Sequence, residues 1–418
     1  MNQHIYDVII IGGGAAGFFT AINIAERSED LKILILEKDI HLLSKVKISG
    51  GGRCNVTNSC FDIRELISNY PRGGKELIGP FHTFSTGDTV HWFEKRGVKL
   101  KTESDGRIFP VTNDSQTIIN CFIALSSKHK IEIMKRASVT GFSKEKDDFV
   151  VQAKAGDKFT AKKIVLTSGS NKSMWGCLAQ TGHRIIEPVP SLFTFNVKDN
   201  LLKGLSGVSV ENVVIKLNGF SKSISGPLLI THWGLSGPAV LKLSAFAARE
   251  LSEVNYKNFI VVDWVPGLSR DEIISLLKQH SEKEKNKMIS KTALFNIPRR
   301  LLDNIIDKAE IDLNKQWGSI SRKEMNTLSE IFKSTKLFVD GKSTFKEEFV
   351  TAGGVDLKEV NFKSMESKLV KNLFFAGEVL NIDAVTGGFN FQAAWTTAWI
   401  AAKSISEKFG KKVNQEKK

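Results

Sequence analysis

A short apolar run that ends in a cluster of glycines restricts what this chain can fold into. Residues 8–11 are too few to cross a membrane, so they predict a buried parallel strand, and Gly12 supplies the tight turn after it. Gly14 lacks the Cβ that would keep a pyrophosphate away from the backbone, and Gly17 lets the next helix pack closely against the sheet. The N–H groups at the start of that helix favour phosphate. The pattern therefore predicts a Rossmann-type dinucleotide-binding unit.

An acidic residue closes the second apolar run of this unit. Residues 32–36 predict the second strand, and Glu37 follows at its end. Its carboxylate can accept hydrogen bonds from both hydroxyl groups of a ribose, whereas it would repel a 2′-phosphate. Strand, glycines, helix, second strand and acid in this order are far more specific than the glycines alone. This half of the chain does not by itself separate NAD from FAD.

A segment near the C-terminus favours FAD. Residues 373–378 are a short apolar run that ends in Gly377 and Glu378, and a glycine-rich segment, residues 386–392, leads into an apolar helix. This order resembles the closing motif of glutathione-reductase-type FAD proteins. The resemblance implies that the acid holds the ribityl chain and that the positive end of the helix faces the flavin pyrimidine, which stabilises anionic reduced flavin. An ordinary strand, turn and core helix is the alternative.

Composition fits an enzyme of more than one domain. The chain has 418 residues, and 41% of them are hydrophobic. No apolar run is long enough for a membrane span, so we expect a cytoplasmic protein without a membrane partner. Its four cysteines form neither a CxxC pair nor a zinc pattern, so we expect no metal.

The net charge of the chain is +14, since lysine and arginine number 59 against 45 acidic residues. That charge suits RNA, although the lysines are spread along the chain and equally suit an ordinary solvated surface.

The periodicity of the chain predicts an α/β cofactor domain with an insertion. We expect a helix around residues 89–94, strands near 131–134 and 149–153, a returning strand at 163–166 and a short helix at 172–180. Two close prolines predict a linker at 187–191, and residues 411–418 are predicted to be a disordered tail. The predicted domains are 1–190, the first part of the FAD-binding domain; 191–268, a β-rich domain; 269–344, a helical subdomain; and 345–418, the second part of the FAD-binding domain.

Three further motifs carry a family resemblance. They are residues 47–58 (KISGGGRCNVTN), residues 229–238 (LITHWGLSGP), and residues 351–355 (TAGGV) followed by 364–368. Together with the segment 377–392, they resemble the HI0933-like (BaiN/YhiN) family of bacterial NAD(P)/FAD-dependent oxidoreductases, over nearly the whole chain. The resemblance implies a glutathione-reductase-type FAD-binding Rossmann domain interrupted by a β-rich domain and a small helical domain. Members often have Thr-Gly-Gly after the returning strand, where this chain has residues 167–170 (TSGS), which leaves the local flavin contacts open.

The cofactor candidates come from these segments. The glycine triplet at residues 50–52 can bring several N–H groups to a flavin or a phosphate, and Arg53 adds charge, although such a triplet can also be a plain flexible loop. Asp383 and Asn390 are expected to face the flavin or its ribityl chain, or else to cap the last helix. The full set is Gly12, Gly14, Ala15, Ala16, Gly17, Glu37, Lys38, Lys45, Gly50, Gly51, Gly52, Arg53, Val139, Thr167, Ser168, Gly169, Gly377, Glu378, Asp383, Gly388, Phe389, Asn390 and Gln392.

Two residues are candidates for catalysis. His232 lies in a glycine- and proline-rich segment, where it can be a proton donor, a phosphate contact or a buried structural histidine. Cys54 is the second candidate donor. A Cys54–Cys60 pair would suggest a redox disulfide, but the spacing is one residue too long and no second nucleotide fingerprint follows a strand in mid-chain. Disulfide reductase is therefore a weak alternative, and NADH or NADPH is expected to bind only transiently.

The expected chemistry follows from flavin. Reduced flavin can deliver hydride to an electron-poor double bond while a nearby acid protonates the other carbon. The family resemblance implies reduction of a uridine in 23S ribosomal RNA to dihydrouridine, enone reduction in bile-acid metabolism, or amine oxidation. We predict an FAD-dependent oxidoreductase that reduces an activated C=C bond, with the ribosomal-RNA uridine as first candidate. The alternatives are a small-molecule oxidoreductase of the enone reductase or aminoacetone/amine oxidase type, and a flavin-bound RNA-binding factor without turnover.

Overall fold

The computed structural model describes residues 4–154, 156–343 and 350–416. The chain forms two compact units. The first unit joins Met1–Val189 to Lys346–Lys418, and the second unit is Pro190–Phe345. Among the described residues, no helix is both long and apolar enough to cross a membrane.

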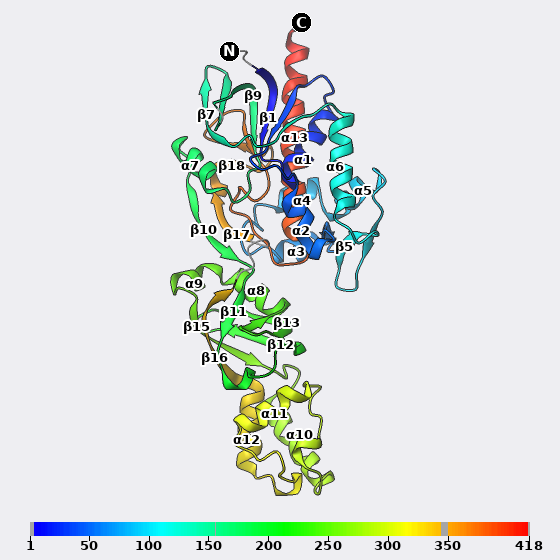
Figure 1. The fold of residues 1–418 in the computed structure, drawn as a ribbon, viewed down its shortest axis with the longest axis vertical. Helices are drawn as coiled ribbons and strands as arrows, with labels where there is room; N and C mark the ends of the chain where they lie inside the picture. Colours follow the sequence, from blue (N-terminus) through cyan, green and yellow to red (C-terminus); the bar gives the residue numbers. More distant parts are fainter. Residues whose placement is uncertain (1–3, 155, 344–349, 417–418) are drawn as a thin grey trace. The chain divides into compact units, whose positions relative to one another are not determined.

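A mainly parallel sheet forms the centre of the first unit (Figure 1). β1 (His4–Ile11) pairs in parallel with β2 (Ile33–Leu36) on one side and β9 (Lys158–Leu166) on the other. β6 (Glu132–Met134) pairs in parallel with β2, and β20 (Leu373–Phe375) with β9. The first half of the chain thus returns to the sheet beside β1 as β9, and the second half adds β20 beside β9. Antiparallel strands complete this sheet: β7 (Val139–Glu145), β8 (Asp148–Ala153), β18 (Val360–Asn361) and β19 (Glu366–Ser367).

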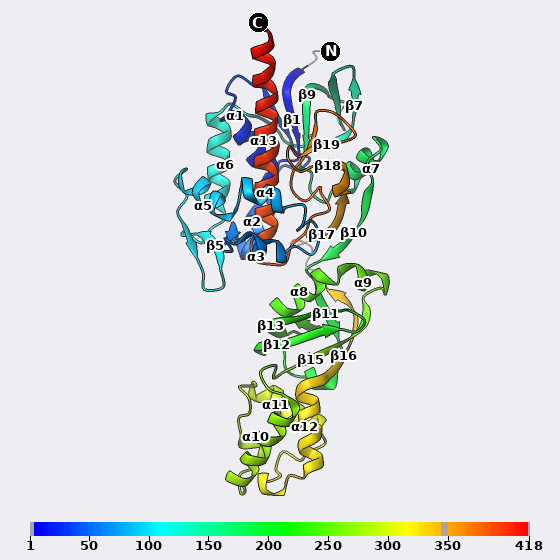
Figure 2. The same cartoon turned by 180° about the vertical axis from the view of Figure 1, so that it is seen from behind.

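Helices α1 (Ala15–Ala25) and α13 (Phe389–Glu416) pack against each other beside this sheet (Figure 2). Alternate side chains of β1 enter the same core as these helices. Aromatic rings fill the space, with Phe19 4.5 Å from Trp92 and 5.2 Å from Trp395 between ring centroids. Residues 8–11 are at most 3% exposed, as expected for a strand covered on both faces.

The remaining elements of the first unit surround this core. They are α2 (Ser44–Gly52), β3 (Thr57–Asn58), α3 (Ile63–Ser68), α4 (Ile78–Thr83), α5 (Thr86–Glu94), β4 (Leu100–Thr102), β5 (Arg107–Pro110), α6 (Gln116–Lys128), α7 (Lys172–Gln180), β10 (Ile185–Ser191), β17 (Val350–Val355) and η4 (Leu357–Glu359). The helices predicted around residues 89–94 and at 172–180, and the strands predicted near 131–134, 149–153 and 163–166, are confirmed.

Two local predictions are wrong in part. Residues 187–191 contain the boundary between the two units, which is the place of the predicted linker, but they also belong to a strand, β10, which pairs with β17. Its prolines lack an N–H group, but a two-stranded sheet gives each strand an open edge where proline is tolerated. Residues 411–416 are not a disordered tail, because α13 continues through Glu416, and residues 417–418 lie outside the described residues.

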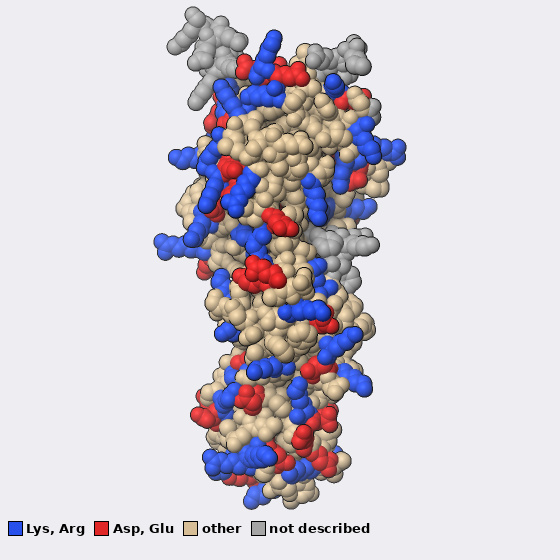
Figure 3. All heavy atoms as spheres, turned by 90° about the vertical axis from the view of Figure 1, so that its left-hand side faces the viewer, with Lys and Arg blue, Asp and Glu red and all other residues tan. Residues whose placement is uncertain are grey.

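Charges of both signs are interspersed on the face drawn in Figure 3. Lysines and arginines of that face stand beside aspartates and glutamates in both units. This agrees with the even spread of lysine along the sequence, so net charge alone does not mark an RNA-binding surface.

The second unit is built on a closed β-barrel. Its strands follow the order β11-β14-β13-β12-β15-β16, and β16 pairs with β11 to close the ring. The elements are β11 (Thr194–Val197), η1 (Asn200–Leu202), β12 (Ser209–Leu217), β13 (Ser223–Ile230), β14 (Gly234–Ser236), α8 (Pro238–Phe246), α9 (Ala248–Glu253), β15 (Lys257–Asp263), α10 (Arg270–Lys283), η2 (Ile289–Lys291), α11 (Arg299–Lys308), η3 (Trp317–Ser319), α12 (Arg322–Ser334) and β16 (Thr335–Ser343).

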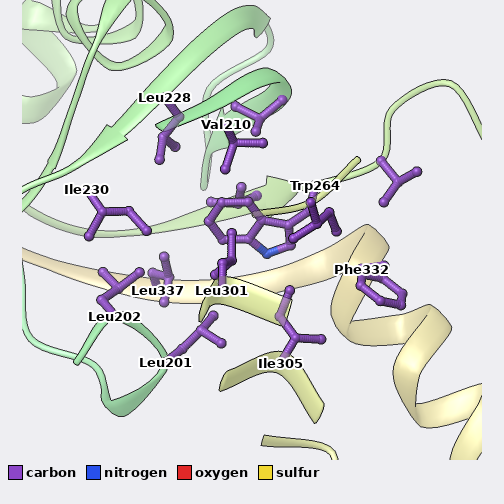
Figure 4. Packing of buried hydrophobic residues seen from close by; sticks show 14 of the residues in the cluster. Leu201, Leu202, Val210, Leu228, Ile230, Trp264, Leu301, Ile305, Phe332 and Leu337 are labelled. Carbon is purple, nitrogen blue, oxygen red and sulfur yellow. The ribbon is translucent and has the colours of Figure 1, made fainter. Parts of the chain in front are cut away.

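Barrel and helices share one hydrophobic core. Figure 4 shows Trp264, which follows β15, beside Leu301 and Ile305 of α11. The predicted helical range 269–344 is wrong at its end, since residues 335–343 form β16 and close the barrel. In β16, apolar and polar residues alternate: Leu337 and Val339 are buried and Lys336 is exposed. This alternation is the sequence signal for the strand, and it follows directly on the helical spacing of the preceding residues.

Candidate functional site

The glycines after β1 have different neighbours. Gly12 has φ +116°, and a Cβ there would lie 2.6 Å from the carbonyl oxygen of Thr167. A Cβ on Gly17 would collide with the carbonyl oxygen of Gly12, so helix α1 needs glycine there to approach the strand. A Cβ on Gly14, in contrast, would meet nothing within 4 Å among the described residues. Gly12 and Gly17 are therefore required by packing, and Gly14 faces open space at the start of α1, where a pyrophosphate would bind.

The Glu37 carboxylate stands at the end of β2, beside this turn. It accepts hydrogen bonds from the backbone N–H of Gly13 at 2.7 Å and of Asp39 at 2.9 Å. Next to it lies a small pocket of about 40 Å³. The pocket is lined by Ile11, Gly12, Leu36, Glu37, Lys38, Ala137, Ser138, Val139, Ser168, Asn171 and Met174. Predicted residues Lys38 and Val139 therefore lie together with Glu37 around one pocket.

The segment after β9 contributes an unsatisfied polar group. The Thr167 hydroxyl lies 3.1 Å from the carbonyl oxygen of Ile11 and 2.9 Å from that of Gly12. The buried Ser168 hydroxyl lines the pocket and has no hydrogen-bond partner among the described residues. Since a buried unpaired polar group costs about 1–3 kcal/mol, this hydroxyl fits a role in binding a polar ligand. Open space at Gly14 and the Ser168 hydroxyl together show that the residues present fit a dinucleotide.

The triplet at residues 50–52 ends helix α2 in a left-handed conformation. Gly50, Gly51 and Gly52 have φ of +58°, +68° and +82°. A Cβ on Gly50 would lie 2.9 Å from the ring of Phe109, whereas Gly51 and Gly52 have no described neighbour within 4 Å of that position. The last two glycines therefore leave open space beside the backbone, as a ligand that approaches it closely would require.

Arg53, which follows the triplet, is already engaged by the protein. Its guanidinium group lies 2.7 Å from the carboxylate of Glu103 and stacks 4.0 Å from the ring centroid of Phe109. The guanidinium group of Arg53 is thus paired with the carboxylate of Glu103. The structure gives no support to a contact between Arg53 and phosphate.

Cys54 lies inside the core of the first unit. Its side chain is 0% exposed, and burial raises the pKa of its thiol to about 12. A thiol in this environment stays protonated and has no access to solvent, so packing explains Cys54 better than proton transfer does. All four cysteines are free.

Glu378 connects the two halves of the first unit. It follows Gly377, whose φ is +76° and whose Cβ would lie 2.9 Å from the Cβ of Ala16 in α1. The Glu378 carboxylate forms an ion pair with Lys45 and accepts a hydrogen bond from the N–H of Thr351 at 3.3 Å. The predicted residues Ala16, Lys45, Gly377 and Glu378 are thus brought together. A Cβ on predicted residue Gly169 would lie 3.7 Å from the same carboxylate, which adds the segment after β9 to this group.

The segment before α13 is held by the protein itself. A Cβ on Gly388 would lie 2.5 Å from the carbonyl oxygen of Thr57. The buried Asp383 carboxylate forms an ion pair with Arg72, and the Asn390 amide exchanges hydrogen bonds of 3.0 and 3.1 Å with the backbone of Ala384. These contacts hold the start of α13 in place.

Two more predicted residues of this segment have protein partners. Gln392 is 0% exposed and accepts hydrogen bonds from Thr57 at 2.6 Å and Thr89 at 2.9 Å, and its amide nitrogen donates to Thr396 at 3.0 Å. The carbonyl oxygen of Phe389 accepts a hydrogen bond from the Tyr70 hydroxyl at 2.6 Å. Asp383, Asn390 and Gln392 therefore use their polar atoms to build the site, and their predicted flavin contacts remain predictions.

His232 belongs to the second unit and is exposed. Its Nδ1 lies 2.9 Å from the Ser206 hydroxyl, which orients the ring. Both line an open pocket of about 750 Å³ together with Lys198, Asp199 and Lys203. Exposure rules out the buried structural histidine, and the polar lining suits either a proton donor or a phosphate contact.

Some of these residues were absent from the sequence-based candidates. Ser138 and Asn171 line the small pocket, and Ser206 lines the large one. Asn171 caps α7 by accepting hydrogen bonds from the N–H groups of Ser173 and Met174. Its sequence position therefore indicates a helix cap but not its place in the pocket. Among the described residues, no group of three or more His, Cys, Asp or Glu side chains is placed to hold a metal ion.

Comparisons with known proteins agree with this geometry. The HI0933-like protein Rossmann domain matches residues 6–404. The ribosomal RNA dihydrouridine synthase of Haemophilus influenzae is 30% identical over 411 residues, covering 95% of this chain and 98% of that protein. The 3-dehydro-bile acid delta(4,6)-reductase of Clostridium scindens is 26% identical over 409 residues, covering 96% and 98%.

Solved structures share the fold. The 3-ketosteroid-delta4-(5alpha)-dehydrogenase from Rhodococcus jostii RHA1 has a TM-score of 0.51 and 12% identity, over 97% of this chain and 98% of that one. The FrdA chain of Escherichia coli quinol fumarate reductase has a TM-score of 0.50 and 13% identity, over 98% and 71%. With a family match across nearly its whole length and a site that fits the dinucleotide, this chain belongs to the HI0933-like family and is an FAD-dependent oxidoreductase.

Proposed function

We propose that this protein reduces a carbon–carbon double bond conjugated to a carbonyl group, with NADH or NADPH as the electron donor. The observation that carries the proposal is the open dinucleotide site, in which Gly14 faces empty space and Ser168 offers an unpaired buried hydroxyl. The relatives named as a dihydrouridine synthase and a delta(4,6)-reductase both act by saturating a double bond of this kind.

The residues divide the work of holding FAD. We assign Glu37 to the ribose hydroxyls, the N-terminus of α1 to the pyrophosphate, and Glu378 with Lys45 to the ribityl side; the position of Glu37 beside the glycine turn and the ion pair between Lys45 and Glu378 support this assignment. FAD supplies hydride transfer when bound. We assign Gly51 and Gly52 to the ring system, since a Cβ on either would have no described neighbour within 4 Å.

We propose His232 as the proton donor. It is an exposed imidazole, held by Ser206 in the pocket of the second unit. A general acid contributes about 10²- to 10⁴-fold to the rate, so His232→Asn is expected to lower turnover by about that factor while the rate of flavin reduction by NADH stays unchanged. Cys54 does not serve as the donor in this proposal, because its thiol is buried and burial keeps it protonated.

Two substrates have support. Uridine in 23S ribosomal RNA is the first candidate, because of the 30% identical relative and the net charge of +14. A small-molecule enone is the second candidate, because the bile-acid reductase is 26% identical over the same length.

Anaerobic reduction of the purified flavoprotein by NADH, followed by flavin absorbance, tests the donor. A 23S ribosomal RNA transcript and an unsaturated 3-ketosteroid are then offered separately to the reduced enzyme. Dihydrouridine in the transcript establishes the first candidate, and a saturated steroid establishes the second. Flavin that NADH and NADPH never reduce contradicts the proposal and points to an RNA-binding factor without turnover.

A further inference from the structure

An aromatic pair lies on the outer face of the barrel. Phe259 in β15 and Phe338 in β16 are 50% and 42% exposed, although phenylalanine is usually buried. They are direct cross-strand neighbours, their ring centroids are 5.0 Å apart, and their planes are inclined by 57°. The two rings therefore form one continuous aromatic surface facing solvent.

The alternation of side chains between the two faces of each strand explains this exposure. Ile260 and Leu337, the next residues along each strand, are 0% and 1% exposed and point into the barrel, as Figure 4 shows for Leu337. The core is therefore complete without the two rings. A cross-strand aromatic pair stabilises a sheet by about 0.2–1 kcal/mol, which leaves most of the apolar area of both rings in water.

Two lysines flank the next row of the same face. Val261 has Lys216 of β12 as its neighbour on one side and Lys336 of β16 on the other, and both lysines are exposed. Rows on one face of a sheet are about 7 Å apart, so the lysines lie within reach of a group stacked on the rings. Among the described residues, neither lysine has an ion-pair partner.

The carboxylates of this face do have partners. Asp263 forms an ion pair with Lys333 at 2.6 Å, and Asp340 forms one with Lys257 at 3.0 Å. The surface formed by Phe259, Phe338, Lys216 and Lys336, here called the aromatic-lysine face, is therefore apolar at its centre and positive at its edge.

We propose that the aromatic-lysine face binds single-stranded RNA, with unpaired bases stacked on the two rings and phosphates held by the two lysines. Proteins that bind single strands combine stacking aromatic side chains with a basic surface that follows the backbone. A facing second copy of this surface would bring like charges together, whereas RNA supplies the complementary negative charge. The identity of the partner rests on the RNA candidate of the proposed function.

The rings are tested in the FAD-loaded full chain by fluorescence anisotropy with a labelled oligouridine. Phe259→Leu/Phe338→Leu keeps apolar volume but removes the stacking surface, and it is expected to weaken binding about tenfold or more. Phe259→Tyr/Phe338→Tyr keeps the ring and should retain binding within about twofold. Phe61→Leu is the matched control, because Phe61 is 61% exposed in the first unit, and it should leave affinity unchanged.

The lysines are tested through the salt dependence of the same binding. Lys216→Gln/Lys336→Gln is expected to lower the slope of log K against log salt by about 1.4, since each contact with a single-strand phosphate contributes about 0.7. Binding of a fully duplex RNA should be insensitive to the leucine pair, because duplex bases are not available for stacking.

Two outcomes overturn the inference. One is unchanged oligouridine affinity in the leucine pair, and the other is loss of self-association in that variant while RNA affinity stays constant, which would identify a contact between copies. The proposed function is judged separately by product formation. If RNA binds through this face but is never reduced, RNA is not the substrate, although the face is an RNA-binding surface. If the leucine pair forms dihydrouridine with an unchanged KM, RNA is the substrate, but this face does not bind it.

Discussion

At the scale of the residue, Gly14 and Gly17 belong to the same glycine motif but are needed for different reasons. Gly17 is required by the fold, because a Cβ there would collide with the carbonyl oxygen of Gly12. Gly14 is not required by any described neighbour, so its missing side chain leaves room for a ligand.

Substitution should separate these purposes. Gly17→Ala is expected to destabilise the protein by about 1–3 kcal/mol through overpacking, seen as a lower midpoint of urea unfolding in the FAD-free protein. Gly14→Val should leave that midpoint close to wild type and weaken FAD binding at least about tenfold, measured by flavin fluorescence. Equal FAD affinity in Gly14→Val and wild type would place the pyrophosphate elsewhere.

At the scale of the element, His183 joins the end of α7 to the strand pair β19 and β20. It is 3% exposed, its Nδ1 lies 2.8 Å from the Thr181 hydroxyl, and its Nε2 lies 2.8 Å from the Ser367 hydroxyl. Ser367 accepts hydrogen bonds from the N–H groups of Leu369 and Val370, so its own proton is available to Nε2. The ring is therefore neutral with its proton on Nδ1, and burial lowers its pKa although the Glu359 charge acts in the opposite direction.

This arrangement predicts loss of stability in acid. Because the folded-state pKa lies below the unfolded value of about 6.5, stability from His183 is complete above that value and is lost as the pH falls towards the folded pKa. The loss is about 1.4 kcal/mol for each unit between the two values.

The free energy of urea unfolding between pH 7.5 and 5 measures this effect. His183→Gln should lower stability at pH 7.5 and flatten the pH dependence. The exposed His91→Gln is the control and should keep the wild-type slope. Burial also lowers the pKa of His280, which adds a slope of the same sign, so the difference between wild type and His183→Gln isolates His183. A slope that His183→Gln leaves intact contradicts the assignment.

At the scale of the whole molecule, the second unit has a core of its own. The closed barrel and helices α10, α11 and α12 surround one apolar cluster, in which Trp264 and Trp317 are 2% and 0% exposed. We therefore expect a fragment of residues 190–345 to fold by itself, with blue-shifted tryptophan emission and one cooperative urea transition. A fragment with exposed tryptophans and no cooperative transition would show that this core depends on the rest of the chain.

Much of the cofactor site could be predicted from sequence because its signals are local. The turn at Gly12 and the acid at Glu37 each follow a short apolar strand, and a buried parallel strand leaves a clear apolar run. Partners distant in sequence could not be predicted in this way. The side chain of Gln392 accepts hydrogen bonds from threonines of two other elements, which no local pattern indicated.

The sequence by itself determined the Rossmann unit, the returning strand and the family, because each depends on residues that are close together in the chain. Only the tertiary structure decided which of the candidate residues face open space and which are satisfied by the protein. It paired Arg53 with Glu103, buried Cys54, exposed His232, and set Phe259 beside Phe338 across two strands. The physical reason is that burial and pairing depend on neighbours far apart in the chain, which local periodicity does not contain.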